Sequence, residues 1–258
     1  GTFTNAERRI SRVRKVMAPK NGYEDWEITQ MLSNALGYPM NYKHASEIMD
    51  EVAQLTPTFK GVSYEKLDKL ESIQWPCNDE FPEGTPTMHV DEFVRGKGKF
   101  FITEYVPTVE KVNGKFPLIM TTGRILAHYN VGAQTRRTKN SEWHDEDLIE
   151  IHPHDAEERG INERDWVGIN SRSGDTVLRA KITDKVQPGV VYTTFHHPVS
   201  GANVITTDNS DWATNCPEFK VTAVQVTKVT QPSNWQSKYQ KFSEKQIDFV
   251  KNGEEKVS

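Results

Sequence analysis

The second half of the chain is a succession of short strand-like segments with a single short helical pattern among them. Residues 166–171 and 176–183 alternate apolar and polar side chains on either side of a Ser-Gly-Asp turn, which is typical of a β-hairpin. Further strand-like segments lie at 118–122, 148–151, 189–195 and 220–229, and a short helix is expected at 153–159. A parallel sheet with covering helices would need a helix between successive strands. The pattern therefore predicts a compact barrel of at least six strands.

The first of these strands leads directly into a polar and cationic loop. Residues 116–137 read FPLIMTTGRILAHYNVGAQTRR, and the apolar run ends at Thr122, Gly123 and Arg124. A hydroxyl, an approachable backbone and a guanidinium at one point suit a phosphate or a polyamide-like heterocycle. On these residues alone, an ordinary polar loop at a strand end remains the simpler interpretation.

A second long segment, residues 195–220, has almost no helical or strand period. Loops of this length inside a compact domain are usually functional or disordered. The apolar residues Val204, Ile205 and Trp212 argue against disorder. The residues after Pro232 predict a helix over 234–250, which docks on the barrel or on a partner.

The first half is interpreted as helical and irregular. Helices are predicted over 24–36, over 45–55 and after Ser63, which is placed to act as an N-cap. The apolar positions of the first helix follow helical spacing, so we expect them in a core. The basic run within residues 1–16 predicts a solvated face.

Two further segments of the first half are predicted to lack helices. Prolines and a glycine between residues 73 and 87 predict an irregular surface connection. Residues 93–106 read as a hairpin that turns at 96–98.

Charge and cysteine content exclude several functional classes. The chain has 258 residues and a formal net charge of −4, which disfavours general nucleic-acid binding. No apolar run approaches the length of a membrane span. The two cysteines, Cys77 and Cys216, provide neither a disulfide framework nor a cysteine metal site, which predicts a reducing, cytoplasmic location.

Several separated motifs together resemble one family. In chain order they read TGRILAHYN, TRR, FHHPVSGANVIT and NCPEFK. They resemble the C-terminal dinucleotide-binding domain of the molybdenum or tungsten bis-pterin oxidoreductases, the dimethyl sulfoxide reductase superfamily. GTFTNAERRISRV resembles the segment that leads into that domain, and GYPMNY, YEKLDKLESIQWPC and GKGKFF resemble the catalytic (alpha) subunit of formate dehydrogenases.

The resemblance implies an α+β fold with a six-stranded double-psi β-barrel. Residues 1–107 would be the end of the central catalytic-subunit domains, helical or irregular with a hairpin. Residues 108–230 would be the molybdopterin dinucleotide-binding barrel, and residues 231–258 a helical tail. A chain that begins in this way is expected to be the C-terminal portion of a longer polypeptide.

The implied cofactor is molybdenum or tungsten bis(molybdopterin guanine dinucleotide). The residues that carry over as cofactor-binding are Thr122, Gly123, Arg124, His128, Tyr129, Asn130, Asn203 and Lys220. In this assignment Arg124 binds a pyrophosphate, Gly123 allows close backbone approach, Asn203 hydrogen-bonds the pterin and Lys220 faces the same anion. Phe195 lies on the substrate side of the pterin.

Other polar residues of the motifs are interpreted as structural or remain open. His196 and His197 are expected to hydrogen-bond within their loop rather than to ligate a metal. Arg136 and Arg137 are either cofactor contacts or a solvated rim. We expect no catalytic residue and no metal ligand in this chain, because nothing matches the family's metal ligand or its iron-sulfur cysteines.

The implied reaction is oxidation of formate to carbon dioxide, or the reverse reaction, by a multi-subunit enzyme. Its other components would be the N-terminal portion of the same subunit, which would carry an iron-sulfur cluster, and electron-transfer subunits. One alternative is a nitrate reductase of the same superfamily, although IQWPC at 73–77 favours formate. The other is a stand-alone double-psi barrel that binds a ligand or partner without redox activity.

Overall fold

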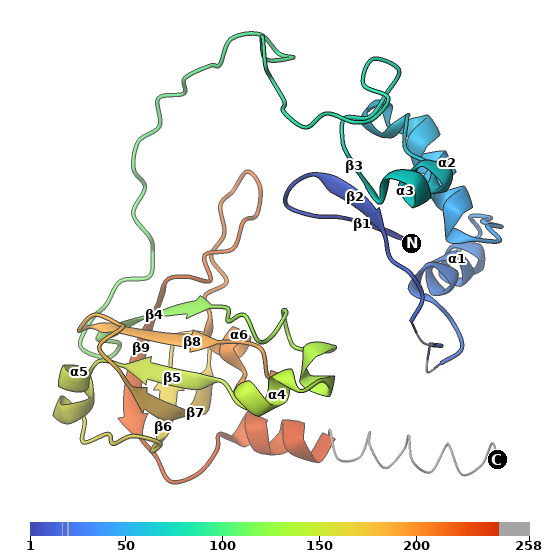
Figure 1. The fold of residues 1–258 in the computed structure, drawn as a ribbon. Helices are drawn as coiled ribbons and strands as arrows, with labels where there is room; N and C mark the ends of the chain where they lie inside the picture. The colour runs from blue at the N-terminus through green and yellow to red at the C-terminus, as the bar shows by residue number, and fades with distance from the viewer. Residues whose placement is uncertain (17, 20, 243–258) are drawn as a thin grey trace, which may run out of the picture. The chain divides into compact units, whose positions relative to one another are not determined.

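The structure is a computed structural model that describes residues 1–16, 18–19 and 21–242 (Figure 1). Contacts between residues divide the chain into two units, Gly1–Thr103 and Glu104–Ser258, and each is described by itself. Within the described residues, no helix has the length and apolar character needed to cross a membrane.

The first unit combines a small antiparallel sheet with three helices. The sheet has the order β1-β2-β3, with β1 at Thr2–Thr4, β2 at Arg9–Arg12 and β3 at Ser72–Gln74. The helices are α1 at Asp25–Ala35, α2 at Ala45–Leu55 and α3 at Tyr64–Leu70, with a short 3₁₀ helix η1 at Pro57–Phe59. The core of this unit comprises Ile10, Met49, Val62, Leu67, Ile73 and Cys77.

The predicted helices of the first unit are present, and their ends follow from local chemistry. The Ser63 side chain accepts a hydrogen bond from the Lys66 N–H, as an N-cap does. The Glu24 and Glu27 carboxylates form a capping box at the start of α1.

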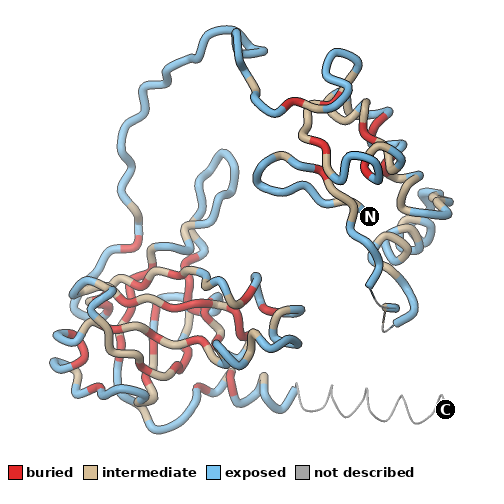
Figure 2. Tube along the Cα trace, viewed as in Figure 1, coloured by how far each residue is buried: buried red, intermediate tan, exposed pale blue. Residues whose placement is uncertain are grey.

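Two expectations for the first unit are wrong. Helix α1 has no buried residue, and Leu32 and Leu36 are 60% and 78% exposed, so its apolar positions do not form a core. Residues 93–106 form no hairpin, because this segment has no strand and its side chains are exposed (Figure 2). Residues 2–12 contain two strands, of which β1 pairs with β2 and β2 pairs with β3, and the basic side chains Arg9, Arg14 and Lys15 are exposed, as expected of a solvated face.

Two arginines of the basic run also stabilise other segments of the first unit. Arg8 donates to the carbonyls of Trp75, Thr85 and Pro86, and Arg12 contacts the Asp68 carboxylate. Because a guanidinium carries several donors in a fixed fork, one arginine satisfies several backbone acceptors of an irregular segment.

The second unit is a closed barrel of six strands in the order β4-β8-β5-β7-β6-β9. The strands are β4 Leu118–Gly123, β5 Leu148–Ile151, β6 Trp166–Asn170, β7 Asp175–Ile182, β8 Val190–Thr194 and β9 Thr222–Lys228. The pairs β4–β8 and β5–β7 are parallel and the others antiparallel. The predicted six-stranded barrel and the mixed α+β composition are confirmed.

Alternating side chains fill the barrel with aliphatic groups. The strand β4 alternates buried and half-buried residues, and its inward Leu118 and Met120 are 2% and 0% exposed. The other inward residues include Ile149, Ile151, Val167, Ile169, Ala180, Val191 and Val224. Closure removes free sheet edges, so a barrel of short strands needs no covering layer of helices.

Short helices occupy the connections of the barrel. Helix α4 spans Asn140–Trp143, α5 spans Pro153–Glu158 and α6 spans Ala202–Ile205, and 3₁₀ turns lie at Thr135–Arg137 (η2) and Pro198–Ser200 (η3). The predicted helix after residue 153 is thus confirmed at α5.

The described part of the tail packs on the barrel. Residues 234–242 are helical, and the rest of the predicted tail helix lies outside the described residues. The Gln236 amide exchanges hydrogen bonds with both the N–H and the carbonyl of Val177 and also donates to Val199. Trp235 donates to the Asp175 carbonyl at 2.7 Å. These bonds satisfy backbone groups at the start of β7 that lack a strand partner.

Candidate functional site

Strand register brings the two predicted site segments to the same end of the barrel. β4 and β8 run parallel with Gly123 opposite Thr194, so Arg124 and Phe195 leave the sheet side by side. β9 runs antiparallel to β4 with Met120 opposite Thr222, which places the residues before β9 beside the end of β4. We call this end, from which residues 124–147, 195–221 and 171–174 emerge, the site end.

Arg124 is exposed and lies over an aromatic ring at the site end. Its guanidinium carbon is 5.1 Å from the centre of the Phe195 ring, a distance at which cation–π attraction operates. The contact holds the guanidinium beside the ring, and its N–H groups can donate in pairs to the oxygens of an anion such as a phosphate. The parallel register therefore orients the residue that was predicted to bind a pyrophosphate.

Lys220 meets Thr122 across 98 residues of sequence. The Lys220 ammonium donates to the carbonyl of Thr122, while the Thr122 hydroxyl donates to the carbonyl of Phe219 at 3.1 Å. These two side-chain bonds join the end of β4 to the segment before β9, beyond the last pair of the two strands, Met120 and Thr222. Lys220 retains further N–H donors, because an ammonium has three.

Gly123 is required by a neighbouring side chain. A Cβ at this position would lie 2.3 Å from the hydroxyl oxygen and 2.5 Å from a ring carbon of Tyr192. The structure therefore explains the glycine by the Tyr192 ring, whereas the sequence prediction explained it by backbone approach to a ligand.

The loop after β4 is held by the buried His196. The N–H of Ile125 donates to the His196 Nε2 at 3.1 Å, so the other ring nitrogen, Nδ1, carries the proton and donates to the Asn130 carbonyl at 2.6 Å. Its side chain is fully buried. His196 thus forms the loop hydrogen bonds that were expected for it.

His128 is also satisfied within the protein. Its Nε2 donates to the His144 carbonyl at 2.7 Å, and its Nδ1 accepts from the Thr135 hydroxyl at 3.0 Å. Both ring nitrogens therefore have partners, and His128 is only 4% exposed. By contrast, Tyr129 is 75% exposed and Asn130 adopts a positive φ of 48° on the same loop. The loop presents Tyr129 and Asn130 outward and keeps His128 inside.

The buried carboxylate Asp147, which the sequence did not single out, joins β5 to the segment after β8. β5 is antiparallel to β8 with Ile149 opposite Thr193, so Asp147 reaches residues 194–197. It accepts hydrogen bonds from the Thr194 hydroxyl and from the N–H groups of His196 and His197. Burial alone would raise the pKa of Asp147, but the adjacent His197 ring and these bonds hold the pKa well below its usual range.

Within the described residues, the ring nitrogens of His144 and His197 that face Asp147 form no hydrogen bond, although both lie within ion-pair distance of its carboxylate. The His144 Nε2 lies 3.7 Å and the His197 Nδ1 3.3 Å from the Asp147 Oδ1. Burial lowers the pKa of His144, which favours its neutral form. No sequence spacing indicated this cluster, because its members come from two segments that meet only in the barrel.

Asn203 is exposed on α6 beside a surface recess of about 780 Å³. Glu110, Arg172 and Phe219 also line this recess, and the Arg172 guanidinium pairs with the Glu110 carboxylate at 2.9 Å. Asn203 and Lys220 thus lie on connections of the same end. The exposed Arg136 donates to the Val131 carbonyl at 3.2 Å.

Comparison with known proteins agrees with this geometry. Residues 118–223 match the family model described as the molydopterin dinucleotide binding domain. Over 235 residues the chain is 40% identical to the F420-dependent formate dehydrogenase subunit alpha of Methanocaldococcus jannaschii and covers 89% of itself and 35% of that protein. It is 37% identical over the same shares to subunit alpha of the F420-dependent formate dehydrogenase 1 of Methanococcus maripaludis.

More distant similarities point the same way. The chain is 35% identical over 242 residues to a putative formate dehydrogenase of Staphylococcus aureus, of which it covers 24%. Among solved structures, acetylene hydratase from Pelobacter acetylenicus matches with a TM-score of 0.62 over 86% of this chain and 35% of that one. Sequence identity there is 13%, so this match concerns the fold.

The predicted resemblance is therefore confirmed. The chain is a homologue of formate dehydrogenase alpha subunits and contains a region that matches molydopterin dinucleotide binding domains. It spans about a third of the length of the F420-dependent relatives, of which it covers 35%.

Proposed function

Proceeding from this homology, we propose that the chain is the pterin-binding portion of a formate dehydrogenase catalytic subunit, an enzyme that oxidises formate to carbon dioxide. In this proposal the site end of the barrel binds one guanine dinucleotide of a molybdenum or tungsten bis-pterin cofactor. The proposal keeps the sequence-based division into residues 1–107, 108–230 and 231–258.

One observation carries this proposal: three exposed cations of the site end, Arg124, Arg136 and Lys220, lack carboxylate partners among the described residues, although Arg172 pairs there with Glu110. Arg124 lies on Phe195, Lys220 donates to a backbone carbonyl, and Arg136 does the same. Cations at an exposed edge that are not neutralised within the protein suit a polyanion such as a pyrophosphate. The recess beside Asn203, about 780 Å³, is in the usual size range of cofactor sites.

The residues of the site end would hold such a cofactor by complementary chemistry. The Arg124 guanidinium would form paired hydrogen bonds to phosphate oxygens, and the remaining Lys220 donors would face the same charge. Asn203 would offer both a donor and an acceptor to a heterocycle edge. The cofactor supplies the redox chemistry when bound, and the protein supplies position and electrostatic tuning.

The inner residues of the site end would act by shaping it. His196 and His128 hold the loop that presents Tyr129 and Asn130. We therefore propose that Tyr129 and Asn130 contact the cofactor and that the two histidines support the loop. Phe195 would border the substrate side while carrying Arg124. Thr122 and Gly123 would complete the wall through their backbone.

The remaining components follow from the relatives' names. These relatives are called subunit alpha, so we propose that electron-transfer subunits accompany this chain in a cytoplasmic complex. An iron-sulfur cluster would lie in the part of the catalytic subunit outside this chain.

Substitution at the site end tests the proposal in the intact enzyme. Arg124→Ala and Asn203→Ala should each lower the content of pterin and guanine nucleotide released on denaturation, by about tenfold for Arg124 because charged hydrogen bonds contribute about 1.5–3 kcal/mol. Lys228→Ala, an exposed cation at the far end of β9, serves as the control and should leave the content unchanged. Full cofactor content in both site variants would exclude the assignment.

A substrate assay separates the alternatives. With an artificial electron acceptor or donor, the enzyme should oxidise formate and should not reduce nitrate. A chain that carries no pterin in any preparation and still binds protein partners would indicate a stand-alone module.

A further inference from the structure

The four histidines gathered at the site end divide into two pairs with different hydrogen bonding. His128 and His196 have partners at both ring nitrogens. His144 and His197 each have one buried ring nitrogen that forms no hydrogen bond with any described residue, and both of these nitrogens face Asp147 at ion-pair distance. Buried polar atoms are nearly always satisfied, so the second pair requires an explanation.

The three facing atoms have the spacing of metal ligands. The Asp147 Oδ1 lies 3.3 Å from the His197 Nδ1 and 3.7 Å from the His144 Nε2, and all three atoms lie within 4.8 Å of one another. A tetrahedral ion with bonds of about 2.0–2.1 Å holds its ligand atoms about 3.3 Å apart. Modest side-chain rotation would therefore place all three around one ion.

Burial and anchoring favour a built site over a chance cluster. His197 is 8% and Asp147 3% exposed. The Asp147 carboxylate is fixed by the Thr194 hydroxyl and the His196 N–H, which donate to Oδ1, and by the His197 N–H, which donates to Oδ2. Such supporting bonds orient the carboxylates that bind metals.

We propose that His144, Asp147 and His197 bind a divalent transition-metal ion, for which zinc is the best match. Two imidazoles and one carboxylate are a ligand set that zinc accepts while keeping a fourth position for water. Asp147 and His197 also line a pocket of about 290 Å³ that the tail helix borders through Gln236, so two of the three groups lie beside an open space. The ion would clamp the segment before β5 to the segment after β8. This assignment goes beyond the proposed function and does not depend on it.

A second group of possible ligands supplies a matched control. His154, Asp155 and Glu158 also come within 4.8 Å of one another, at the start of α5. The His154 side chain is 62% exposed, and it has no buried nitrogen awaiting a partner. We expect no stoichiometric binding there.

Zinc titration of the purified 258-residue chain, first stripped with a chelator, tests the assignment. Calorimetry with zinc chloride should show one ion per chain, and cobalt(II) should give the intense visible absorption of a tetrahedral site. His144→Gln and His197→Gln should each weaken zinc binding at least tenfold, since even the loss of supporting residues costs about 10–100-fold. His154→Gln should leave the affinity unchanged.

The histidine variants are chosen so that a change in zinc affinity does not arise from a change in the fold. His144→Gln retains the backbone carbonyl to which His128 donates and leaves the bonds of Asp147 intact, so circular dichroism should show an unaltered fold. Absence of stoichiometric zinc binding by the unmodified chain would overturn the proposal. So would equal affinities for the unmodified chain and His144→Gln, or a loss in His154→Gln as large as in His197→Gln.

Discussion

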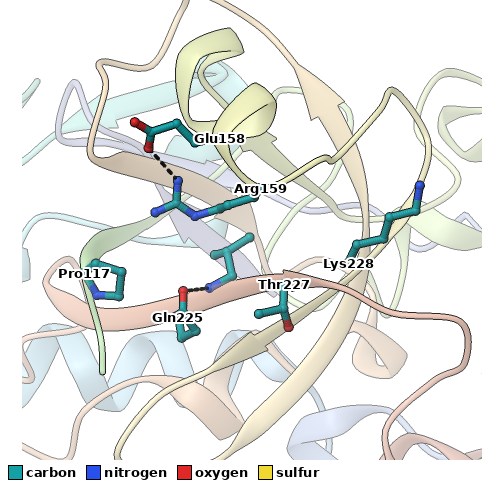
Figure 3. Close-up of a pocket in the computed structure, with 7 residues that line it drawn as sticks. Pro117, Glu158, Arg159, Gln225, Thr227 and Lys228 are labelled. Carbon is teal, nitrogen blue, oxygen red and sulfur yellow. Dashed lines mark hydrogen bonds and ion pairs between the residues drawn. The ribbon is translucent and has the colours of Figure 1, made fainter. Parts of the chain in front are cut away.

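The two ends of the barrel are built from the same strands, but they differ in how many of their cationic side chains pair with carboxylates. At the end opposite the site end, Arg159 contacts Glu158 and Asp155, and Lys228 pairs with Asp165 at 2.7 Å. A recess of about 480 Å³ lies there. Among its lining residues, Arg159 and Glu158 point toward each other (Figure 3). At the site end, Arg124 and Lys220 have only a ring and a carbonyl as partners.

The difference in charge pairing separates structure from binding. Neutralised cations at the opposite end contribute modestly to stability, as exposed ion pairs do. Cations without carboxylates at the site end keep their potential for an external anion. Both recesses contain a paired arginine, Arg159 at the opposite end and Arg172 at the site end, so the ends differ in the cations that lie outside these pairs, Arg124 and Lys220.

The largest expected effect concerns the buried histidine of the site end. His196→Ala removes the partners of the Ile125 N–H and the Asn130 carbonyl and leaves a cavity, so we expect a loss of about 2–4 kcal/mol in the free energy of unfolding. Urea denaturation followed by circular dichroism measures it. His154→Ala at the opposite end, with an exposed ring, should change stability by less than about 0.5 kcal/mol. Equal effects would remove the contrast between the two ends.

The second largest effect is the loss of stability when alanine replaces either of two glycines, one limited by a neighbouring side chain and the other by its backbone conformation. Gly123→Ala forces a Cβ against the Tyr192 ring and should cost about 1–3 kcal/mol. Gly189→Ala has open space but a φ of 82°, so it should cost about 1–2 kcal/mol through backbone strain.

A double-mutant cycle distinguishes these two causes. Tyr192→Ala should relieve the cost of Gly123→Ala and leave that of Gly189→Ala unchanged, as measured by thermal or urea unfolding. Additive behaviour at Gly123 would show that the ring does not exclude a side chain there.

The third effect compares two lysines that flank the same strand. Lys220→Ala should weaken cofactor retention in the intact enzyme about tenfold, or about 1.4 kcal/mol, because a cation directed at an anion is lost. Lys228→Ala removes the same group from the other end of β9, where Asp165 already neutralises it, and should leave retention unchanged. Cofactor released per protein after a fixed dilution time gives the comparison. Similar losses in both variants would indicate a general charge effect.

The smallest expected effects concern the lowered pKa values of two carboxylates, Asp211 at the site end and Asp165 at the opposite end. The Thr214 hydroxyl and the N–H groups of Thr214, Cys216 and Ala213 lower the pKa of Asp211 to about 2. A lowered pKa in the folded state means that the stabilisation is present above the ordinary value of 3.8 and is lost as pH falls toward about 2. Exchange protection of the Cys216 amide should fall in that window, and Asp211→Asn should abolish the pH dependence.

At the opposite end, the pKa of Asp165 is lowered first by its contact with Lys228. Exposed ion pairs are screened by salt, so about 1 M salt should raise the pKa of Asp165 more than that of Asp211. Carboxyl chemical shifts measured against pH report both values. An equal response would show that the two shifts have the same origin.

Local patterns predicted most of the elements but not their partners. The hairpin of β6 and β7, the strand β5 and the Ser63 cap follow from residues that are near one another in sequence, and all are present. Helix α1 has the expected position, yet its apolar side chains are exposed, because periodicity indicates a face and not what covers it. The apolar residues of 93–106 also lie in an exposed segment without strands, so an apolar pattern there did not indicate a packed hairpin.

The candidate site divides in a similar way. The motif residues around Arg124, Asn203 and Lys220 were visible in the sequence because each motif is contiguous. Asp147 and its contacts with His144 and His197 were not visible, since these contacts arise where β5 lies antiparallel to β8. The reason for Gly123 was also hidden, because Tyr192 belongs to another strand.

By itself, the sequence determined the strand periods, the helix caps and the cationic loop after β4, since these depend on residues a few positions apart. Only the tertiary structure decided which histidine nitrogens have partners, which cations are neutralised and which loops share an end of the barrel. The physical reason is register: barrel closure sets β4 against β8 and β9, and β5 against β8. Those pairings bring together groups from distant parts of the chain.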